Sequence, residues 1–277
     1  MLLGFSSALL IGITEGLMYL LVTLGFFMTL KVWNFFNVWH VSVVTLAAYL
    51  TYHFYYILHL PLTFSIILSI LVVIGIGLLI AKYLYHPLQG SSFTQMILSL
   101  GLVFATQATL EMIFGSNPVP YNSPLPAVNF LGVSLTSVLI SILSLVLAGS
   151  LWYFLRKTRR GRIVYSFSDN PLLAEFRGRN PETIFIYTWT ISLILAALAG
   201  IFSGWSLTLV PTMGWQLIII VFSITLLGFT RLEGIVVSSL VIGISMSLGV
   251  YFLLPSSYKL AIPLTILIIV YIVRKYR

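Results

Sequence analysis

The sequence has very few charged residues and no cysteine. Charged side chains make up 7% of its 277 residues and hydrophobic side chains 60%, whereas a soluble domain carries about 25% charged residues. Water does not solvate so apolar a surface, so a soluble protein is excluded and a lipid bilayer is the expected environment. The absence of cysteine also excludes disulfide bonds and thiol chemistry.

Charge is missing altogether from three long segments, residues 32–81, 112–155 and 183–230. Because a membrane-spanning helix needs about 20 apolar residues, the first and third segments each hold two spans. The middle segment holds one span and a polar loop. Helix-breaking residues divide the apolar runs at His59–Pro61, Gly115–Pro118, Pro211 and Pro255.

These breaks predict an all-α fold, a polytopic transmembrane helical bundle of about eight or nine spans in one domain, residues 1–277. The candidate spans are Leu2–Leu30, Asn34–Leu58, Leu62–Lys82, Phe93–Phe114, Val133–Leu155, Thr183–Leu207, Gly214–Phe229, Gly234–Leu254 and Leu260–Val273. The segment Trp33–His40 can also be read as a broken or re-entrant helix, which would change the count and the side of the N-terminus.

Lysine and arginine predict the orientation, because short cytoplasmic loops carry the excess of basic residues. The segment 156–182 holds seven of the fourteen basic residues, so we expect it on the cytoplasmic side, together with the tail 274–277. The loop 115–132 and the N-terminus then lie outside. The net charge of +8 comes from residues beside helix ends, so we expect a lipid bilayer and not a nucleic acid as partner.

The cytoplasmic loop is predicted to contain a short helix. Asp169 or Asn170 suits its N-cap, Pro171 its first turn and Gly178 the left-handed position after its end. A helix this short is unstable alone, so its apolar residues must pack against something. Two readings remain open: the helix rests on lipid headgroups, or it docks on a cytoplasmic partner. Its apolar face would be formed by Leu172, Leu173 and Phe176, with Ala174 between them.

Several motifs in order along the chain resemble the branched-chain amino-acid permease family of prokaryotic ABC importers. They are Gly12, Gly16, Tyr19 and Leu24-Gly25; Asn37-Val-Trp-His40; Pro87-Leu88 with Gly90; Thr158-Arg-Arg-Gly-Arg162; Asp169-Asn-Pro171 with Ala174, Gly178 and Asn180; and Pro211-Thr-Met-Gly214. The sequence departs from the family pattern at Val41, at Leu172 and Leu173, and at Gly228–Gly234, so the resemblance does not fix the substrate.

The resemblance implies a transport subunit in the plasma membrane of a prokaryote. In that family the loop 156–182 carries the coupling helix that contacts the ATPase, so Asp169, Pro171, Gly178 and the apolar residues between them would form that contact. The implied partners are two cytoplasmic ATPase subunits, a second related permease chain and an extracytoplasmic solute-binding protein. The alternatives are a secondary transporter or channel that works without ATPases, and an intramembrane enzyme.

Three residues are candidates for the substrate pathway. Asn37 and His40 share one helical face, and a broken helix start at this point would present free backbone NH groups to a substrate carboxylate. The alternative is structural: Asn37 caps the helix and His40 bonds to a neighbouring span. Glu15 is an acid within the first span, where acids are costly and often functional; it would serve the pathway or a subunit contact.

Enzymatic and cofactor chemistry finds no support in the sequence. The histidines show no metal-ligand spacing, the chain has no phosphate-binding P-loop, and no serine and histidine form a nucleophilic arrangement. We therefore expect no catalytic residue, metal or cofactor in this chain, and ATP hydrolysis on the partner chains.

Overall fold

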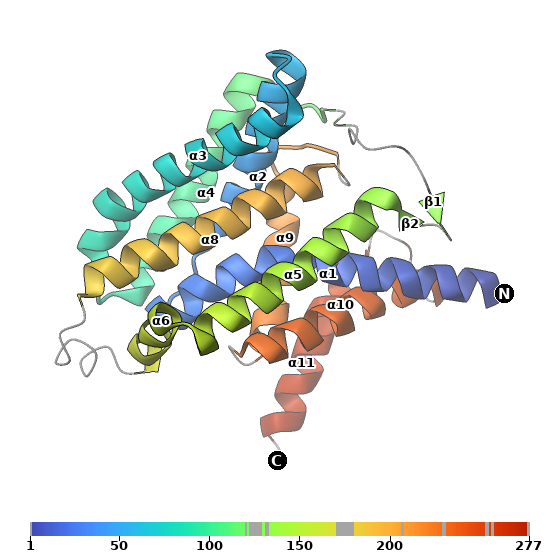
Figure 1. Ribbon diagram of the computed structural model, residues 1–277. Coiled ribbons are helices and arrows are strands. Elements are labelled where there is room, and N and C mark those ends of the chain that lie inside the picture. The colour runs from blue at the N-terminus through green and yellow to red at the C-terminus, as the bar shows by residue number, and fades with distance from the viewer. Residues whose placement is uncertain are drawn as a thin grey trace.

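The structure is a computed structural model that describes residues 2–119, 121, 129–130, 133–169, 180–205, 208–228, 231–252, 255 and 258–275. The described part is almost entirely helical (Figure 1). Its only strands are the two-residue pair β1 (Asn129–Phe130) and β2 (Val133–Ser134), which form an antiparallel hairpin. The prediction of an all-α helical bundle is confirmed.

The described helices follow the predicted spans closely. Their bounds are α1 Leu2–Trp33, α2 Trp39–Tyr52 with a π-helical extension His53–Ile57, α3 Leu62–Ile80 with short π and 3₁₀ turns to Leu88, α4 Ser92–Phe114, α5 Leu135–Lys157, α6 Arg159–Asp169, α8 Pro181–Gly204, α9 Met213–Leu227, α10 Leu232–Phe252 and α11 Ala261–Lys275. Six of them, α1, α3, α4, α5, α8 and α10, are long and apolar enough to cross a membrane, whereas α9 and α11 are apolar but shorter.

The expected break near Trp33–His40 is present, but the second helix begins later than predicted. α1 continues to Trp33, Asn34 takes a positive φ of 53°, and α2 begins at Trp39 instead of Asn34. Asparagine is one of the few residues that tolerates this left-handed conformation. Positive φ is also found at His59 (53°) and at Gly115, at the end of α4 (82°). Both positions are helix breaks that the sequence predicted.

Polar backbone groups of this break form hydrogen bonds with Ser99 of the neighbouring helix α4. The Val38 NH donates to Ser99 Oγ at 3.2 Å, and Ser99 Oγ donates to the Phe36 carbonyl at 3.5 Å. The His40 NH donates to the Asn37 carbonyl at 3.1 Å. Non-helical backbone inside a membrane is tolerated only where it is buried in protein, and these bonds meet that condition.

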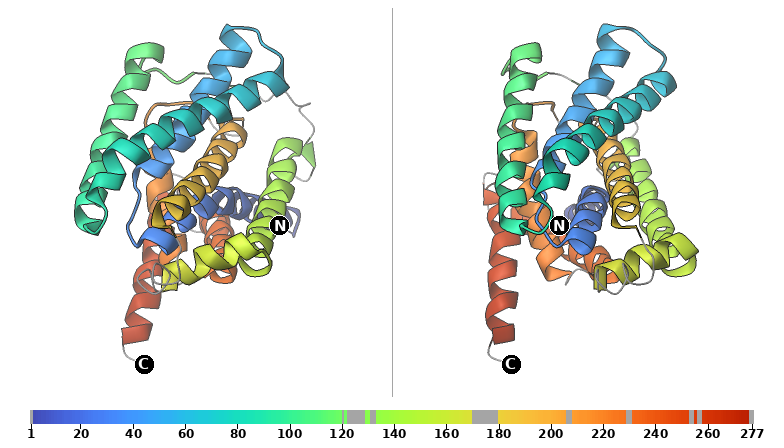
Figure 2. Two further views of the ribbon diagram at one scale, coloured as in Figure 1. Left: turned by 60° about the vertical axis from the view of Figure 1, so that its left-hand side comes forward. Right: turned by 90° about the vertical axis from the view of Figure 1, so that its left-hand side faces the viewer.

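The helices α1 and α8 form the centre of the bundle. α1 packs chiefly on α10 and α8, and α8 packs on α2 and α3. Figures 1 and 2 show α3 and α4 at one edge of the molecule and α11 extending away from it at the C-terminal end. The core therefore lies between α1, α2, α8 and α10.

The interface between α1 and α10 is built from small residues, which let two helix backbones approach closely. A Cβ placed on Gly243 of α10 would overlap the backbone of Gly16 in α1, and one on Gly16 would lie 2.7 Å from the Ser239 carbonyl oxygen. Nearer the N-terminus, Ser247 Oγ donates to the Ala8 carbonyl at 2.6 Å. No larger side chain fits at Gly243 without moving a helix.

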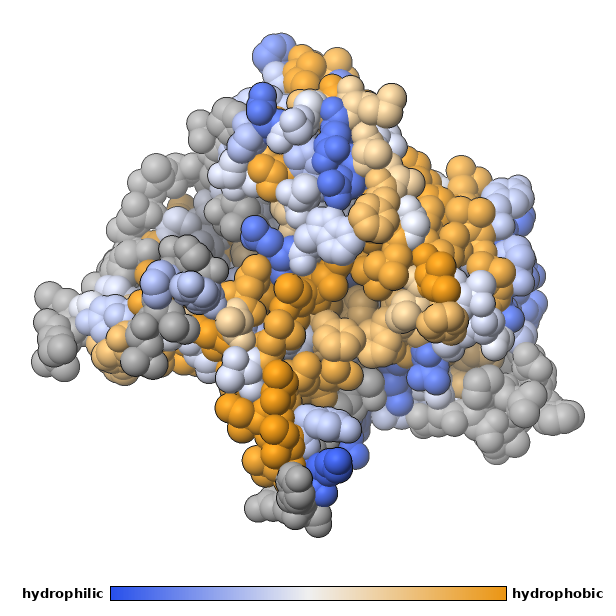
Figure 3. All heavy atoms as spheres, turned by 180° about the vertical axis from the view of Figure 1, so that it is seen from behind, coloured by the Kyte–Doolittle hydropathy of each residue, from blue (hydrophilic) through white to orange (hydrophobic). Residues whose placement is uncertain are grey.

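The outer surface carries many large apolar side chains, as expected for a molecule surrounded by lipid. Examples are Leu71 on α3, Met112 on α4, of which 87% is exposed, and Ile268 on α11. Figure 3 shows extensive hydrophobic surface, including most of the projecting C-terminal helix. Exposed apolar patches of this size are unstable in water and fit a polytopic membrane protein.

The segment 156–182, predicted to be a cytoplasmic loop, contains a helix that the sequence analysis missed. α6, Arg159–Asp169, directly follows α5, and its residues Val164 and Phe167 are each only 3% exposed. Asp169 is the last residue of α6. The other predicted coupling residues, Pro171, Leu172, Leu173, Ala174, Phe176 and Gly178, lie outside the described residues.

Candidate functional site

A cavity of about 750 Å³ lies beside the middle of α1 and the first half of α9. Its described lining residues are Glu15, Met18, Tyr19, Pro118, Thr208, Val210, Met213, Gln216, Leu217, Ile220, Met246, Lys259 and Leu260. They come from α1, α9, α10 and three connecting segments, 115–119, 208–212 and 258–260, that the charge pattern places outside. We call this space the outer cavity.

The outer cavity contains an ion pair between residues 244 positions apart in the sequence. Lys259 Nζ, just before α11, lies 2.6 Å from Glu15 Oε1 on α1. Both side chains are partly buried, with 29% and 25% exposed. The second carboxylate oxygen, Oε2, is buried and has no hydrogen-bond partner. Glu15 therefore keeps one unused acceptor, which is enclosed by protein in this structure.

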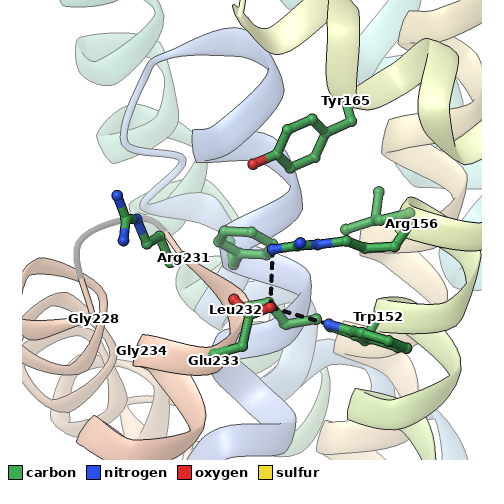
Figure 4. A pocket seen from close by; sticks show the side chains of 10 residues that line it. Trp152, Arg156, Tyr165, Gly228, Arg231, Leu232, Glu233 and Gly234 are labelled. Atoms are coloured by element: carbon green, nitrogen blue, oxygen red, sulfur yellow. Dashed lines mark hydrogen bonds and ion pairs between the residues drawn. The ribbon is translucent and has the colours of Figure 1, made fainter.

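A second cavity, of about 660 Å³, lies at the other end of the same helices (Figure 4). Glu233 Oε1 accepts a hydrogen bond from Trp152 Nε1 and another from Arg156 Nη2, both at 3.0 Å. Tyr165 of α6 points toward this space. Arg231 lies across the space from Trp152 and Arg156 (Figure 4). Since it is lined by α5, α6 and the α9–α10 connection, which are predicted to lie on the cytoplasmic side, we call it the inner cavity.

The two cavities are separated by a closed section of α1. Tyr19 lines the outer cavity and Phe27 the inner one, and eight residues of helix measure about 12 Å. Between them Leu20, Leu21 and Leu24 are fully buried. The outer and inner cavities thus face the same helices from opposite ends, with a packed apolar barrier between them.

Asn37 is buried, with 1% of its surface exposed. Its Oδ1 accepts a hydrogen bond from the Tyr85 hydroxyl at 3.1 Å, and Tyr85 is itself fully buried. The N-cap of α2 is Val38, with no side-chain capping bond. Asn37 therefore links the break before α2 to the end of the third apolar helix instead of capping α2.

His40 connects three helices. Its Nε2 lies 3.1 Å from the Val22 carbonyl on α1, and its Nδ1 lies 3.3 Å from Ser192 Oγ on α8. Ser192 Oγ in turn donates to the Gly25 carbonyl at 2.8 Å. The imidazole is 2% exposed. Neither His40 nor Asn37 lines the outer or the inner cavity.

We expect Asn37→Ala and His40→Ala to lower stability more than transport by the molecules that remain folded. Asn37→Ala leaves the buried Tyr85 hydroxyl without its acceptor, at a cost of about 1–3 kcal/mol. His40→Ala opens a cavity between α1, α2 and α8. Thermal unfolding in detergent and transport per assembled complex measure the two effects separately. Normal thermal stability with impaired transport would instead place these residues in the pathway.

The end of α1 is held between α6 and α8, the two helices that flank residues 170–179. The Trp33 ring centroid lies 5.4 Å from that of Phe167 on α6 and 5.0 Å from that of Phe185 on α8. α8 begins with Asn180 as its N-cap, whose side chain accepts from the Glu182 NH at 2.9 Å. A displacement of α6 or α8 would therefore be transmitted to α1 through the contacts of Trp33 with Phe167 and Phe185.

Sequence reasoning found Glu15 but missed Lys259 and the cluster of Trp152, Arg156 and Glu233. A signal for Lys259 was present, because it is the only charged residue in the apolar run 234–273. A lone acid in the first span and a lone base near the last span are the kind of charges that pair inside a membrane protein. Together, the helices and cavities define a polytopic membrane protein with one cavity at each end of the same helices.

Comparisons with known proteins identify the family. Residues 8–271 match the family described as "Branched-chain amino acid transport system / permease component", and the chain belongs to this family. Its fold is similar to that of a chain of PsaBC from Streptococcus pneumoniae, solved in complex with a Fab, with a TM-score of 0.54, 12% identity, and 95% of this chain and 89% of that chain covered. At this identity the likeness shows the fold alone.

Individual relatives agree with this family. The chain is 30% identical over 161 residues to the probable branched-chain amino acid transport permease protein LivH of Methanocaldococcus jannaschii, a match that covers 57% of this chain and 50% of that protein. It is 23% identical over 290 residues to the high-affinity branched-chain amino acid transport system permease protein LivH of Escherichia coli strain K12, with 98% and 94% covered. The family resemblance of the sequence motifs is confirmed.

Proposed function

We propose that this chain is the transmembrane permease subunit of an ATP-binding-cassette importer for branched-chain or related amino acids. The observation that carries this function is the pair of cavities at opposite ends of α1, α9 and α10, divided by the buried section around Leu20, Leu21 and Leu24. A transporter must never open to both sides at once, and this arrangement provides one barrier with a vestibule on each side. The names of the relatives supply the substrate class.

Nine membrane crossings fit the helices best. The six long apolar helices account for six of them. Trp39–Ile57 forms 19 helical residues when α2 is taken with its π extension, about 28 Å in length, which matches a bilayer core of about 30 Å. α9 and α11, with 15 residues each, complete the count as short crossings.

The contacts support the predicted grouping of the loops on the two sides of the membrane, and the charge pattern supports an orientation with the N-terminus outside. Loops predicted outside meet in space, since the Val119 NH donates to the Leu209 carbonyl at 2.9 Å. Segments predicted inside also meet: the ring centroids of His86 and Phe185 are 5.7 Å apart. Loops on one side of a membrane can touch, whereas loops on opposite sides cannot.

The partners are those that the permease family implies. The outer cavity borders α9 and the segment just before α11. One chain forms half of a pathway, and a second related permease chain completes it. Two cytoplasmic ATPase subunits contact the segment 169–178, in which the coupling contact is formed by Asp169, Pro171, Leu172, Leu173, Ala174, Phe176 and Gly178. Their closure moves α6 and α8, and Trp33 passes this motion to α1. A solute-binding protein delivers substrate outside.

Reconstitution of the complete complex in proteoliposomes tests this function. We expect uptake of radiolabelled L-leucine, L-isoleucine or L-valine that requires ATP, the ATPase chains and the binding protein. A cysteine introduced at Ser166 on α6 reports the orientation in the same vesicles and should react only with reagent on the ATP side. Uptake that needs no ATPase and follows an ion gradient would contradict the proposal and support a secondary transporter.

A further inference from the structure

The outer cavity combines two opposite charges with a flexible apolar lining. Glu15 and Lys259 contribute the charges, and Met18, Met213 and Met246 are three of its apolar residues. Methionine side chains adapt to ligands of different shape. The cavity volume of about 750 Å³ lies within the range of small-molecule sites, about 300–1,000 Å³.

Ion pairs inside a membrane protein are costly and are retained mainly where they have a role. Packing alone does not explain this one, because the pair borders an open space and Glu15 Oε2 is buried without a partner. A carboxylate normally accepts several hydrogen bonds. Once the ion pair opens and the carboxylate rotates, this oxygen is an acceptor that a cationic group in the cavity would satisfy.

We propose that Glu15 and Lys259 bind the two charged groups of a zwitterionic amino acid as it passes through the outer cavity, an inference that rests on the proposed function. The substrate ammonium group contacts the Glu15 carboxylate, and the substrate carboxylate contacts Lys259 Nζ. The substrate side chain lies among Met18, Met213 and Met246. The ion pair opens to admit the zwitterion, and every charge has a partner in both the empty and the loaded state.

This exchange suits transport because it avoids strong binding. A bare Glu or Lys inside the bundle would carry an unpaired charge between substrates, at a high cost in free energy. With the pair present, the substrate must displace an existing contact of 2.6 Å, which weakens its net affinity. Weak binding allows the substrate to leave toward the inner cavity when the barrier opens.

Cysteine protection in the assembled complex tests the site. Because the chain has no cysteine, Gln216→Cys introduces a single reporter in this chain at an exposed position that lines the cavity. Partner chains without cysteine keep the signal specific. We expect L-leucine to slow the reaction of this cysteine with a small neutral maleimide. The analogues 4-methylpentanoate, which lacks the ammonium group, and isopentylamine, which lacks the carboxylate, should need about 10- to 100-fold higher concentrations.

Variants of the ion pair separate binding from structure. Glu15→Gln and Lys259→Gln should each raise the L-leucine concentration for half-protection by about 10- to 100-fold, the effect of one lost charged contact. The double variant Glu15→Lys with Lys259→Glu keeps an ion pair, so it should unfold at a normal temperature. It exchanges the positions of the two charges. A bound L-leucine would then have to turn its side chain away from the methionines, so we expect no recovery of L-leucine protection.

Two results would overturn this site. The first is that L-leucine, L-isoleucine and L-valine all fail to protect the wild-type cavity. The second is that the single-charge analogues protect as well as L-leucine does, which needs no variant to fold. ATP-dependent uptake by the complex is measured separately. Uptake without protection would refute the site and leave the proposed function standing, whereas protection without ATP-dependent uptake would count against the function.

Discussion

Replacement of Gly243 by leucine should abolish assembly of the folded protein. A Cβ at this position would overlap the backbone of Gly16, and backbone atoms cannot rotate out of the way as a side chain can. Overpacking of an ordinary core costs about 1–3 kcal/mol. Here α1 and α10 would have to separate along their whole contact, and both cavities depend on that contact. The expected cost therefore exceeds this range.

Gly101→Leu is the matched control. Gly101 is exposed on α4, and a Cβ there would meet nothing within 4 Å. Leucine also has a higher helix propensity than glycine by about 0.8–1 kcal/mol, so both substitutions gain equally from local structure. They differ in burial and in the steric overlap, which only Gly243→Leu meets. Size-exclusion chromatography and thermal unfolding in detergent measure the result. Wild-type yield and unfolding temperature for Gly243→Leu would show that α1 and α10 do not pack this closely.

Gly178→Val and Ala174→Asp should reduce transport to background while the protein remains inserted and assembled. The proposed coupling segment sits between α6 and α8, which hold Trp33 at the end of α1. Valine resists the left-handed conformation expected at Gly178, and aspartate at position 174 places a charge on a docking face. Either change would prevent ATPase closure from moving α6, α8 and α1.

Ala174→Ser provides the control for position 174, because serine is small and uncharged. We expect this variant to transport at near wild-type rates. ATPase activity without substrate should persist in Gly178→Val and Ala174→Asp, and the stimulation by substrate-loaded binding protein should disappear. If both variants transport normally and show normal stimulation, the coupling contact lies elsewhere in the complex.

The apolar segments and their ends were predictable because they depend on local chemistry. In lipid a backbone must satisfy its own hydrogen bonds, so a long apolar run becomes a helix whatever its neighbours are. The breaks at His59 and Gly115 follow from conformations that few residues adopt, and both have positive φ in the structure. The sequence analysis missed α6 because its arginines were read as a charged loop, although Val164 and Phe167 already showed a helical spacing.

The candidate site depended on contacts that no local pattern contains. Glu15 could be singled out in the sequence, but its partner Lys259 lies 244 positions away. Only the packing of α1 against α9 and α10 brings the two together. The same holds for His40, whose two ring nitrogens contact α1 and α8. The sequence by itself determined that the chain enters a bilayer as helices, because hydrophobicity and backbone hydrogen bonding act within each segment. Tertiary structure alone decided which polar side chains face a cavity and which lock helices together, because that choice depends on how distant helices pack.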